Sequence, residues 1–412
     1  MEAIPPAVEA DPDEDLRLSA RLAQRLPPQV GGIALNLAGL ATWSHALAEL
    51  HDGLSSAVPS ATRIAMAAAA IIMAVELLKL LVAPSLIREE LCDHKACGSH
   101  GALLMAVTLG AAHLPAGEVA AVAVHTCFAL QALMLLWYLY LVRRQLASVS
   151  PIWYPPTIGI GASAIAMRAI SSLSWRALQL ASFGVALFLC VVMWPCVTAR
   201  LYRSRRTAEA PSVMIHAAPF PLVGLSFMSA FHDEIAWRKQ GWLVFAHVLF
   251  ASSTAAALTT LCAMWARRSA LASFVRSRRE GYVHPEWAAL TFPLVATSQH
   301  ALLYASRVVA PYHSQGASDA ASAWATLTAV VCAAVVLPID LLFLLWGVPL
   351  WLRDGLPLAD RAASVLVAAD PSDVQDVSAP RTLSSSCLRA MPASREAQEA
   401  LHTRSTAADA NG

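Results

Sequence analysis

Residues 117–142 read GEVAAVAVHTCFALQALMLLWYLYLV, and two arginines, Arg143 and Arg144, follow directly. Only one charged residue, Glu118, interrupts this apolar run. Because a helix needs about 20 apolar residues to cross the hydrocarbon core of a bilayer, the run predicts a transmembrane helix. Runs of similar character recur along the chain. They predict ten spans, at about 28–51, 61–83, 99–116, 117–142, 155–174, 177–200, 213–231, 241–265, 286–311 and 321–352.

The composition of the whole chain agrees with a membrane protein. Hydrophobic residues make up 57% of the 412 residues and charged residues 14%, whereas a soluble domain has roughly 25% charged residues. The net charge is +1 and the basic residues are scattered through short loops, which excludes a nucleic-acid-binding surface. Most of the eight cysteines lie in apolar runs, so no disulfide framework is indicated. The sequence therefore predicts an all-α polytopic membrane protein.

Both ends of the chain differ from its apolar centre. Residues 1–27 are acidic and lack the pattern of a cleaved signal peptide, and residues 353–412 are rich in Ala, Ser and Asp without periodicity. We expect disordered tails at 1–27 and 353–412 around a transmembrane domain at 28–352. Arg381 precedes Ser384 by three residues, a common but weak kinase pattern. A regulatory kinase is therefore a candidate partner of the C-terminal tail.

Lys and Arg residues are unevenly divided between the two ends of the predicted helices. Positive residues in short loops favour the cytoplasmic side of a membrane. The N-terminal side has clusters such as Arg203, Arg205 and Arg206. The opposite side has only six basic residues: Arg63, Arg168, Arg176, Arg238, Lys239 and Arg307. This bias predicts that both termini are cytoplasmic.

Helix-breaking and small residues concentrate in the odd-numbered spans. Proline within a span frees backbone carbonyls, which is tolerated where neighbouring helices or a water-filled cavity satisfy them. Small residues permit close packing of helices. Tight packing alone explains the same pattern, so a cavity between the odd spans is one of two interpretations. The residues concerned are Pro28, Pro155, Pro156, Pro219, Pro221, Pro285, Pro293, Gly31, Gly32, Gly39, Gly159 and Gly161.

Four short motifs follow one another along the chain. They are GIALNLAGLATW at 32–43, YPPT at 154–157, APFP at 218–221 and PEWAALTFPL at 285–294. In this order they resemble the family of tellurite-resistance and dicarboxylate transporters, which includes bacterial TehA proteins and plant slow anion channels. The resemblance covers residues 28 to about 350. It implies ten transmembrane helices as five hairpins, a central pore lined by the odd helices, a homotrimer, and substrates among chloride, nitrate, sulfite and dicarboxylates such as malate.

The same resemblance identifies Phe292 as the side chain that closes the pore. A phenyl ring blocks a narrow pore because it excludes water and offers a dehydrated anion no hydrogen bonds. Helical spacing places Ala289, Ala296 and Gln299 on the face of Phe292 as lining residues, and the adjacent Pro293 permits a bend. The other odd spans supply further lining candidates: Gly32, Pro156 and Pro219. The alternative is that Phe292 is an ordinary core or lipid-facing aromatic residue.

Several other titratable residues lie inside the predicted spans. Arg168 is either a snorkelling arginine at the end of its span or an anion-vestibule charge that concentrates anions. Asp340 is expected to face protein or water but has no evident partner, and Glu76 and Lys79 are spaced to pair on one helix face. Four histidines in spans are either packed and hydrogen-bonded or carriers of protons: His45, His125, His247 and His300.

The sequence predicts neither a metal site nor another cofactor. Cys92, His94, Cys97 and His100 are residue types that bind zinc, but they are spaced more closely than in most structural zinc sites. No motif suggests catalysis, so we do not expect an enzyme. The leading hypothesis is a channel for chloride or nitrate in the plasma membrane. The alternatives are a proton-linked exporter of sulfite or malate with the same fold, and a membrane-embedded enzyme or sensor.

Overall fold

The computed structural model describes residues 29–115, 117–143, 149–168, 175–203, 212–231, 240–266, 268 and 288–347. The chain divides into two units, Met1–Leu356 and Pro357–Gly412, and all the described residues belong to the first. The predicted tails at 1–27 and 353–412, and the prolines Pro28 and Pro285, lie outside the described residues. The domain boundaries therefore stay a prediction.

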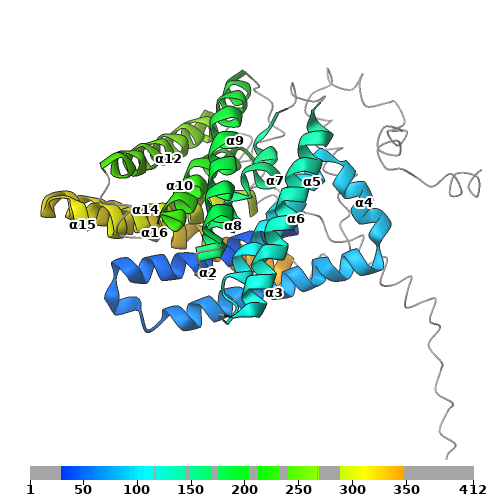
Figure 1. Ribbon diagram of the computed structural model, residues 1–412, viewed down its shortest axis with the longest axis horizontal. Helices are drawn as coiled ribbons and strands as arrows, with labels where there is room; N and C mark the ends of the chain where they lie inside the picture. The colour runs from blue at the N-terminus through cyan, green and yellow to red at the C-terminus, as the bar shows by residue number, and fades with distance from the viewer. Residues whose placement is uncertain are drawn as a thin grey trace, which may run out of the picture. The chain divides into compact units, whose positions relative to one another are not determined.

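Helices account for all the regular structure of the described residues, which confirms the all-α fold class (Figure 1). The α-helices are α2 (Val30–Leu50), α3 (Val58–Val82), α4 (Pro84–Cys92), α5 (His94–Ala111), α6 (Glu118–Val142), α7 (Tyr154–Ile158), α8 (Gly161–Met167), α9 (Arg176–Arg203), α10 (Pro219–Ala230), α12 (Gln240–Ala266), α14 (Ala288–Tyr304), α15 (Ala310–Tyr312) and α16 (Gln315–Leu342). Short 3₁₀ segments are η1 (Asp52–Leu54), η3 (Pro151–Trp153) and η7 (Ser212–Ala217). Two π-helical segments are η10 (Ala305–Val309) and η11 (Phe343–Gly347).

Two of the spans predicted as continuous helices are interrupted in the structure. The span predicted at 155–174 is broken into α7 and α8 by a turn that begins at Gly159. The span predicted at 213–231 starts as η7 before Pro219 opens α10. Proline is favoured in the first turn of a helix, because the N–H groups of this turn make no hydrogen bond within the helix and the missing N–H of proline costs nothing there. Pro155 in α7 and Pro219 in α10 therefore mark where these helices start.

The stretch between the predicted spans at 61–83 and 99–116 is also helical. Pro84 opens the short helix α4, in a stretch where the ten predicted spans place no helix. The next helix, α5, begins at His94 because the Asp93 carboxylate accepts hydrogen bonds from the backbone N–H groups of Lys95 and Ala96.

Six helical segments of the described chain are long and apolar enough to cross a membrane. Five of them, in α3, α6, α9, α12 and α16, have only 22–33% of their apolar window buried within the protein, so their surfaces suit contact with lipid. The sixth, η7 with α10, is 89% buried. The other predicted spans correspond to α2, α5, α7 with α8, and α14. The span of α7 and α8 is broken, α14 has only 17 residues, and α2 and α5 carry the buried polar residues Asn36 and His100.

Consecutive helices pair into five hairpins, as the resemblance implies. Helix α2 contacts α3, α5 contacts α6, α8 contacts α9, α10 contacts α12, and α14 contacts α16. The first members of the hairpins also contact one another in a closed series: α2 with α5, α5 with α7 and α8, α8 with α10, α10 with α14, and α14 with α2. We call this series the inner ring. The more exposed members of the hairpins pack around it.

Five contacts of the inner ring have a glycine at the point of close approach: α2 with α5, α5 with α7, α8 with α10, α10 with α14, and α14 with α2. A side-chain carbon added at any of the five glycines would lie 2.3–3.2 Å from an atom of the neighbouring segment. Such residues let helix backbones approach closely in a membrane. The pairs are Gly31 with Ser99, Gly101 with Pro156, Gly161 with Ser226, Gly224 with His300, and Gly39 with Val295. These glycines set the spacing of the ring.

Replacing Gly224 by alanine is expected to destabilise the inner ring. The new methyl group would start 2.3 Å from the imidazole of His300, a rigid side chain that is only 2% exposed. Overpacking a core typically costs about 1–3 kcal/mol. Thermal unfolding in detergent measures the loss, and Gly184→Ala, where no atom lies within 4 Å of the added carbon, is the matched control. If His300→Ala in the same chain restores none of the lost stability, this contact is not the cause.

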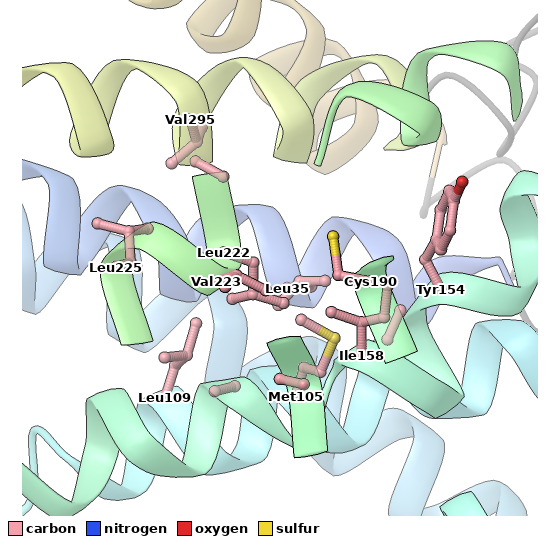
Figure 2. Close-up of a cluster of buried hydrophobic side chains, with 14 of the residues drawn as sticks. Leu35, Met105, Leu109, Tyr154, Ile158, Cys190, Leu222, Val223, Leu225 and Val295 are labelled. Carbon is pink, nitrogen blue, oxygen red and sulfur yellow. The ribbon is translucent and has the colours of Figure 1, made fainter. Parts of the chain in front are cut away.

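An apolar core joins the segments of the inner ring. Figure 2 shows buried side chains from α2, α5, α7, α9, α10 and α14 in this core, with Leu35, Leu222 and Val223 close together. Lipid tails are as apolar as these side chains, so van der Waals packing rather than the hydrophobic effect holds helices together in a membrane. The core therefore stabilises the ring only if it is closely packed.

Candidate functional site

The contact between α2 and α14 brings the predicted gate residue against the first motif of the sequence. Ring atoms of Phe292 lie 3.7 and 3.8 Å from the position where a Gly39 side chain would start. Phe292 is partly buried and packs against the hydrophobic core. Glycine at position 39 therefore leaves the space that the phenyl ring occupies on the α2 side.

Two hydrogen bonds continue this contact along the same pair of helices. Thr42 lies with its hydroxyl 3.2 Å from Oε1 of Gln299, and the indole N–H of Trp43 donates to Ser298 over 2.9 Å. Residue numbers rise in the same direction along both helices, from the contact of Gly39 with Phe292 to the contact of Thr42 with Gln299. The two helices are therefore parallel, as two odd-numbered spans must be.

The face of α14 predicted to line a pore is largely enclosed by protein. Ala296 is 1% exposed and Gln299 is 7% exposed, whereas Ala289 and Phe292 are only partly buried. Pro293 lies inside α14 and has no N–H to donate to the carbonyl of Ala289. The helix ladder is therefore interrupted beside Phe292.

The remaining predicted lining residues lie in other contacts of the inner ring. Gly32 is partly buried and lies seven residues before Gly39, so it shares the face of α2 that meets α14. Pro156 lies against Gly101 at the contact of α5 with α7, and Pro219 is buried at the start of α10. Helical spacing thus places Gly32 on the face of α2 that meets α14, whereas Pro156 and Pro219 lie in separate ring segments.

The buried acid Asp340 has a partner that the sequence did not reveal. Its Oδ2 accepts a hydrogen bond from the side-chain amide of Asn36, which links α16 to α2. Both residues are almost fully buried, at 3% and 0% exposure. The other oxygen of each side chain has no hydrogen-bond partner within the described residues. Asp340 is therefore held in the protein interior, next to the inner ring.

A charged cluster joins α3, α4 and α5. Lys79 donates to Oε1 of Glu90 over 2.6 Å, and Nε2 of His100 lies 2.8 Å from the other oxygen of Glu90. Glu76 and Lys79, which are spaced to pair on one helix face, attract each other electrostatically, and Lys79 also donates its hydrogen bond to Glu90 of α4. Burial would raise the pKa of Glu90, but the hydrogen bonds from His100 and Lys79 outweigh it and lower the pKa.

The candidate zinc ligands do not form a metal site in the described part of the chain. His100 contacts Glu90, and no group of three suitable ligands gathers among the described residues. Three of the histidines expected in spans have hydrogen-bond partners: His45 with Thr62, His125 with the carbonyl of Ala121, and His247 with Tyr304. The fourth, His300, is packed against Gly224.

Arg168 lies at the end of α8 and interacts electrostatically with Arg307 and Glu49. Arg307 follows α14, and Glu49 is close to the end of α2. The three residues therefore mark the end of the inner ring toward which α2, α8 and α14 run. The sequence had singled out only Arg168 among them.

An inner ring of helices surrounded by exposed apolar spans defines a polytopic helical membrane protein. The family model described as voltage-dependent anion channel matches residues 25–339. The chain therefore belongs to the voltage-dependent anion channel family and is an integral membrane protein. The match confirms the resemblance drawn from the four motifs. No curated protein sequence matches the chain significantly.

Proposed function

We propose that this protein is a passive channel for small anions such as chloride and nitrate, and that Phe292 closes its pore. Membership of an anion channel family supports the class of function. The position of Phe292 supports its role. The residue belongs to α14, a helix of the inner ring, where its phenyl group lies beside Gly39 and where the next residue is a proline that interrupts the helix ladder. Gly39 has no side chain to hold the phenyl group in place, and Pro293 weakens the helix that carries it. Both features allow the Phe292 side chain to change position.

In this proposal the pathway runs between the segments of the inner ring. Ala289 and Ala296 are the small neighbours of the gate, and the amide of Gln299 offers a hydrogen bond to a passing anion. The bend at Pro293 places the phenyl ring toward the pathway. Other segments of the ring contribute Gly32, Pro156 and Pro219 as lining residues.

The Arg168 side chain is proposed to concentrate anions at one mouth of this pathway. Arg168→Ala is then expected to lower anion conductance several-fold at low salt. The effect should fade at high salt, because the Debye length falls from about 10 Å at 0.1 M to about 3 Å at 1 M. Single-channel recording at both salt concentrations measures it, with Arg63→Ala as an exposed control. Unchanged conductance at low salt would remove Arg168 from the vestibule.

A proton-linked exporter of sulfite or malate is the second candidate function. Asp340 favours it, because a buried acid inside a membrane domain is typical of proton relays. Flux of chloride, nitrate, sulfite and malate into proteoliposomes under clamped pH separates the two candidates. A channel gives fluxes that follow the anion gradient alone, whereas an exporter gives fluxes that follow the proton gradient. The third hypothesis, an enzyme or sensor, has no supporting observation among the described residues.

The setting of the channel is also a proposal. We place it in the plasma membrane with both termini in the cytoplasm, as the distribution of Lys and Arg predicts. A homotrimer and a kinase acting near Ser384 are the partners that the sequence predicts, and the kinase segment lies outside the described residues. Phosphate added to the tail would act on the Arg-rich loops of the same side.

A further inference from the structure

A buried acid and a buried amide join α16 to α2 inside the membrane domain. The side-chain amide nitrogen of Asn36 donates a hydrogen bond to Oδ2 of Asp340. Asn36 is 0% exposed and Asp340 is 3% exposed, and Asp340 lies within the apolar span Gln315–Leu345. A charged side chain in such a place is costly and usually marks a functional site. The charge state of Asp340 therefore decides whether this contact is stable.

Two oxygen atoms of the pair are left without a hydrogen bond. Oδ1 of Asn36 and Oδ1 of Asp340 are both buried, and neither has a partner among the described residues. When the carboxylate is ionised, both atoms can only accept hydrogen bonds. Buried acceptors are nearly always satisfied, so the ionised pair lacks a donor.

A single proton on Oδ1 of Asp340 supplies that donor. A protonated carboxyl group has one O–H that donates, while its other oxygen still accepts. The O–H would donate to Oδ1 of Asn36, and the Asn36 amide would keep its hydrogen bond to Oδ2. One proton then satisfies both unpaired oxygens and removes a negative charge from the protein interior.

The side chains around Asp340 supply no positive charge within the described part of the chain. The groups that act on it are the Asn36 amide and, about two turns earlier on α16, the Cys332 thiol. The titratable groups of the elements packed against α16 have other partners or are exposed. They are His300 of α14 (beside Gly224), Tyr304 of α14 (with His247), Arg307 of η10 (with Glu49 of α2), His45 of α2 (with Thr62) and the exposed Tyr312 of α15.

We propose that Asp340 and Asn36 form a proton-binding site, which holds α16 to α2 while the proton is bound. Loss of the proton leaves a carboxylate facing an amide oxygen and so loosens the contact between the two helices. The proton stays on Asp340 and does not travel with the anion, in contrast to the proton of a coupled exporter.

This contact lies close to the proposed gate. Gly39, which lies beside Phe292, follows Asn36 by three residues and is therefore about one turn further along α2. Helix α14, which carries Phe292, contacts both α2 and α16. Release of the proton is therefore expected to free the Phe292 side chain to move. This effect on the pathway rests on the proposed channel function, whereas proton binding does not.

Infrared spectroscopy of the purified full-length protein detects the bound proton without any requirement for conduction. An ordinary aspartate has a pKa of about 3.9 and is ionised at about pH 7, whereas a protonated carboxyl group has its own C=O stretching band. We expect this band in the wild-type protein and its loss in Asp340→Asn. Asp319→Asn, at an exposed acid of the same helix that is bonded to Gln315, should keep it. Asn36→Ala should shift the band, because the O–H loses its acceptor.

The pH dependence of stability and of current gives the second measurement. The folded protein holds a proton that the unfolded chain releases, so the wild-type melting temperature in detergent should fall relative to that of Asp340→Asn between about pH 6 and about pH 9. An asparagine at position 340 donates and accepts without a proton, so this variant should stay pH-independent in that contact. The wild-type anion current in planar bilayers should rise several-fold over the same range, and that of Asp340→Asn should stay low.

Absence of the band from the wild-type protein, or a band that remains in Asp340→Asn, overturns the proton site. A wild-type melting temperature that follows the sodium concentration rather than the pH indicates a bound cation and also overturns it. If Asp340→Asn does not fold, reversible loss of the wild-type band at high pH supports the site and an unchanging band overturns it. A band with a pH-independent current keeps the site and rejects its control of the pathway. A band in a protein without anion flux at any pH keeps the site and rejects the channel.

Discussion

Phe292→Ala is expected to produce a large constitutive anion current. Loss of the phenyl ring removes the group that excludes water from the pathway, and a wetted constriction no longer forces an anion to shed its hydration shell. Removing the ring leaves a gap beside Gly39, where it packs against α2. Current through the variant in planar bilayers, relative to the wild-type protein at equal protein amounts, measures the effect.

The matched control for this experiment is Phe188→Ala, the same substitution at a side chain that is 66% exposed on α9. It should leave the current at the wild-type level. If Phe292→Ala folds, reaches the membrane and still carries wild-type current, Phe292 is a packing residue and the gate is wrong. That outcome would support the alternative of an ordinary core or lipid-facing aromatic residue.

Glu90→Ala is expected to cause the largest loss of stability among the charged residues described. Glu90 is the shared acceptor of Lys79 and His100, and Lys79 is only 1% exposed. Removing one partner of a buried ion pair typically costs about 3–5 kcal/mol, because the remaining charge stays buried. Thermal unfolding in detergent measures the loss. The adjacent exposed Glu89→Ala should have little effect, and equal losses in the two variants would contradict the role of the cluster.

The same cluster gives stability a dependence on pH with a definite sign. The pKa of Glu90 is lower in the folded protein than its ordinary value of 4.5, so the folded state favours the ionised carboxylate. Its contribution is therefore complete above pH 4.5 and is lost as the pH falls through the lowered pKa. The stability difference between wild type and Glu90→Gln should shrink on acidification below pH 4.5.

The helices were largely predictable because a membrane requires long apolar runs. The ten predicted segments all contain helix in the structure, and their pairing into hairpins follows from short connections. The breaks at α7 and before α10 were signalled by the prolines Pro155 and Pro219, although the sequence alone does not show how a proline-rich span is satisfied. Helix α4 was missed because its nine residues mix charged and apolar side chains and are too short to span a membrane.

The polar contacts of the candidate site were not predictable in the same way. Asn36 and Asp340 are 304 residues apart, and Arg307 and Glu49 are 258 residues apart. No periodicity within one helix indicates contacts at such separations, which depend on how the inner ring closes. Phe292 could be singled out only because its motif resembles that of a known family.

The reversal potential of the Phe292→Ala current tests the central claim most directly. It is measured across a planar bilayer with a chloride gradient and the same pH on both sides. We expect the current to reverse at the Nernst potential of chloride. When nitrate replaces chloride, the current should reverse at the Nernst potential of nitrate. Reversal at the potential of the cation, or a current that appears only when a pH gradient is imposed, would contradict a passive anion channel.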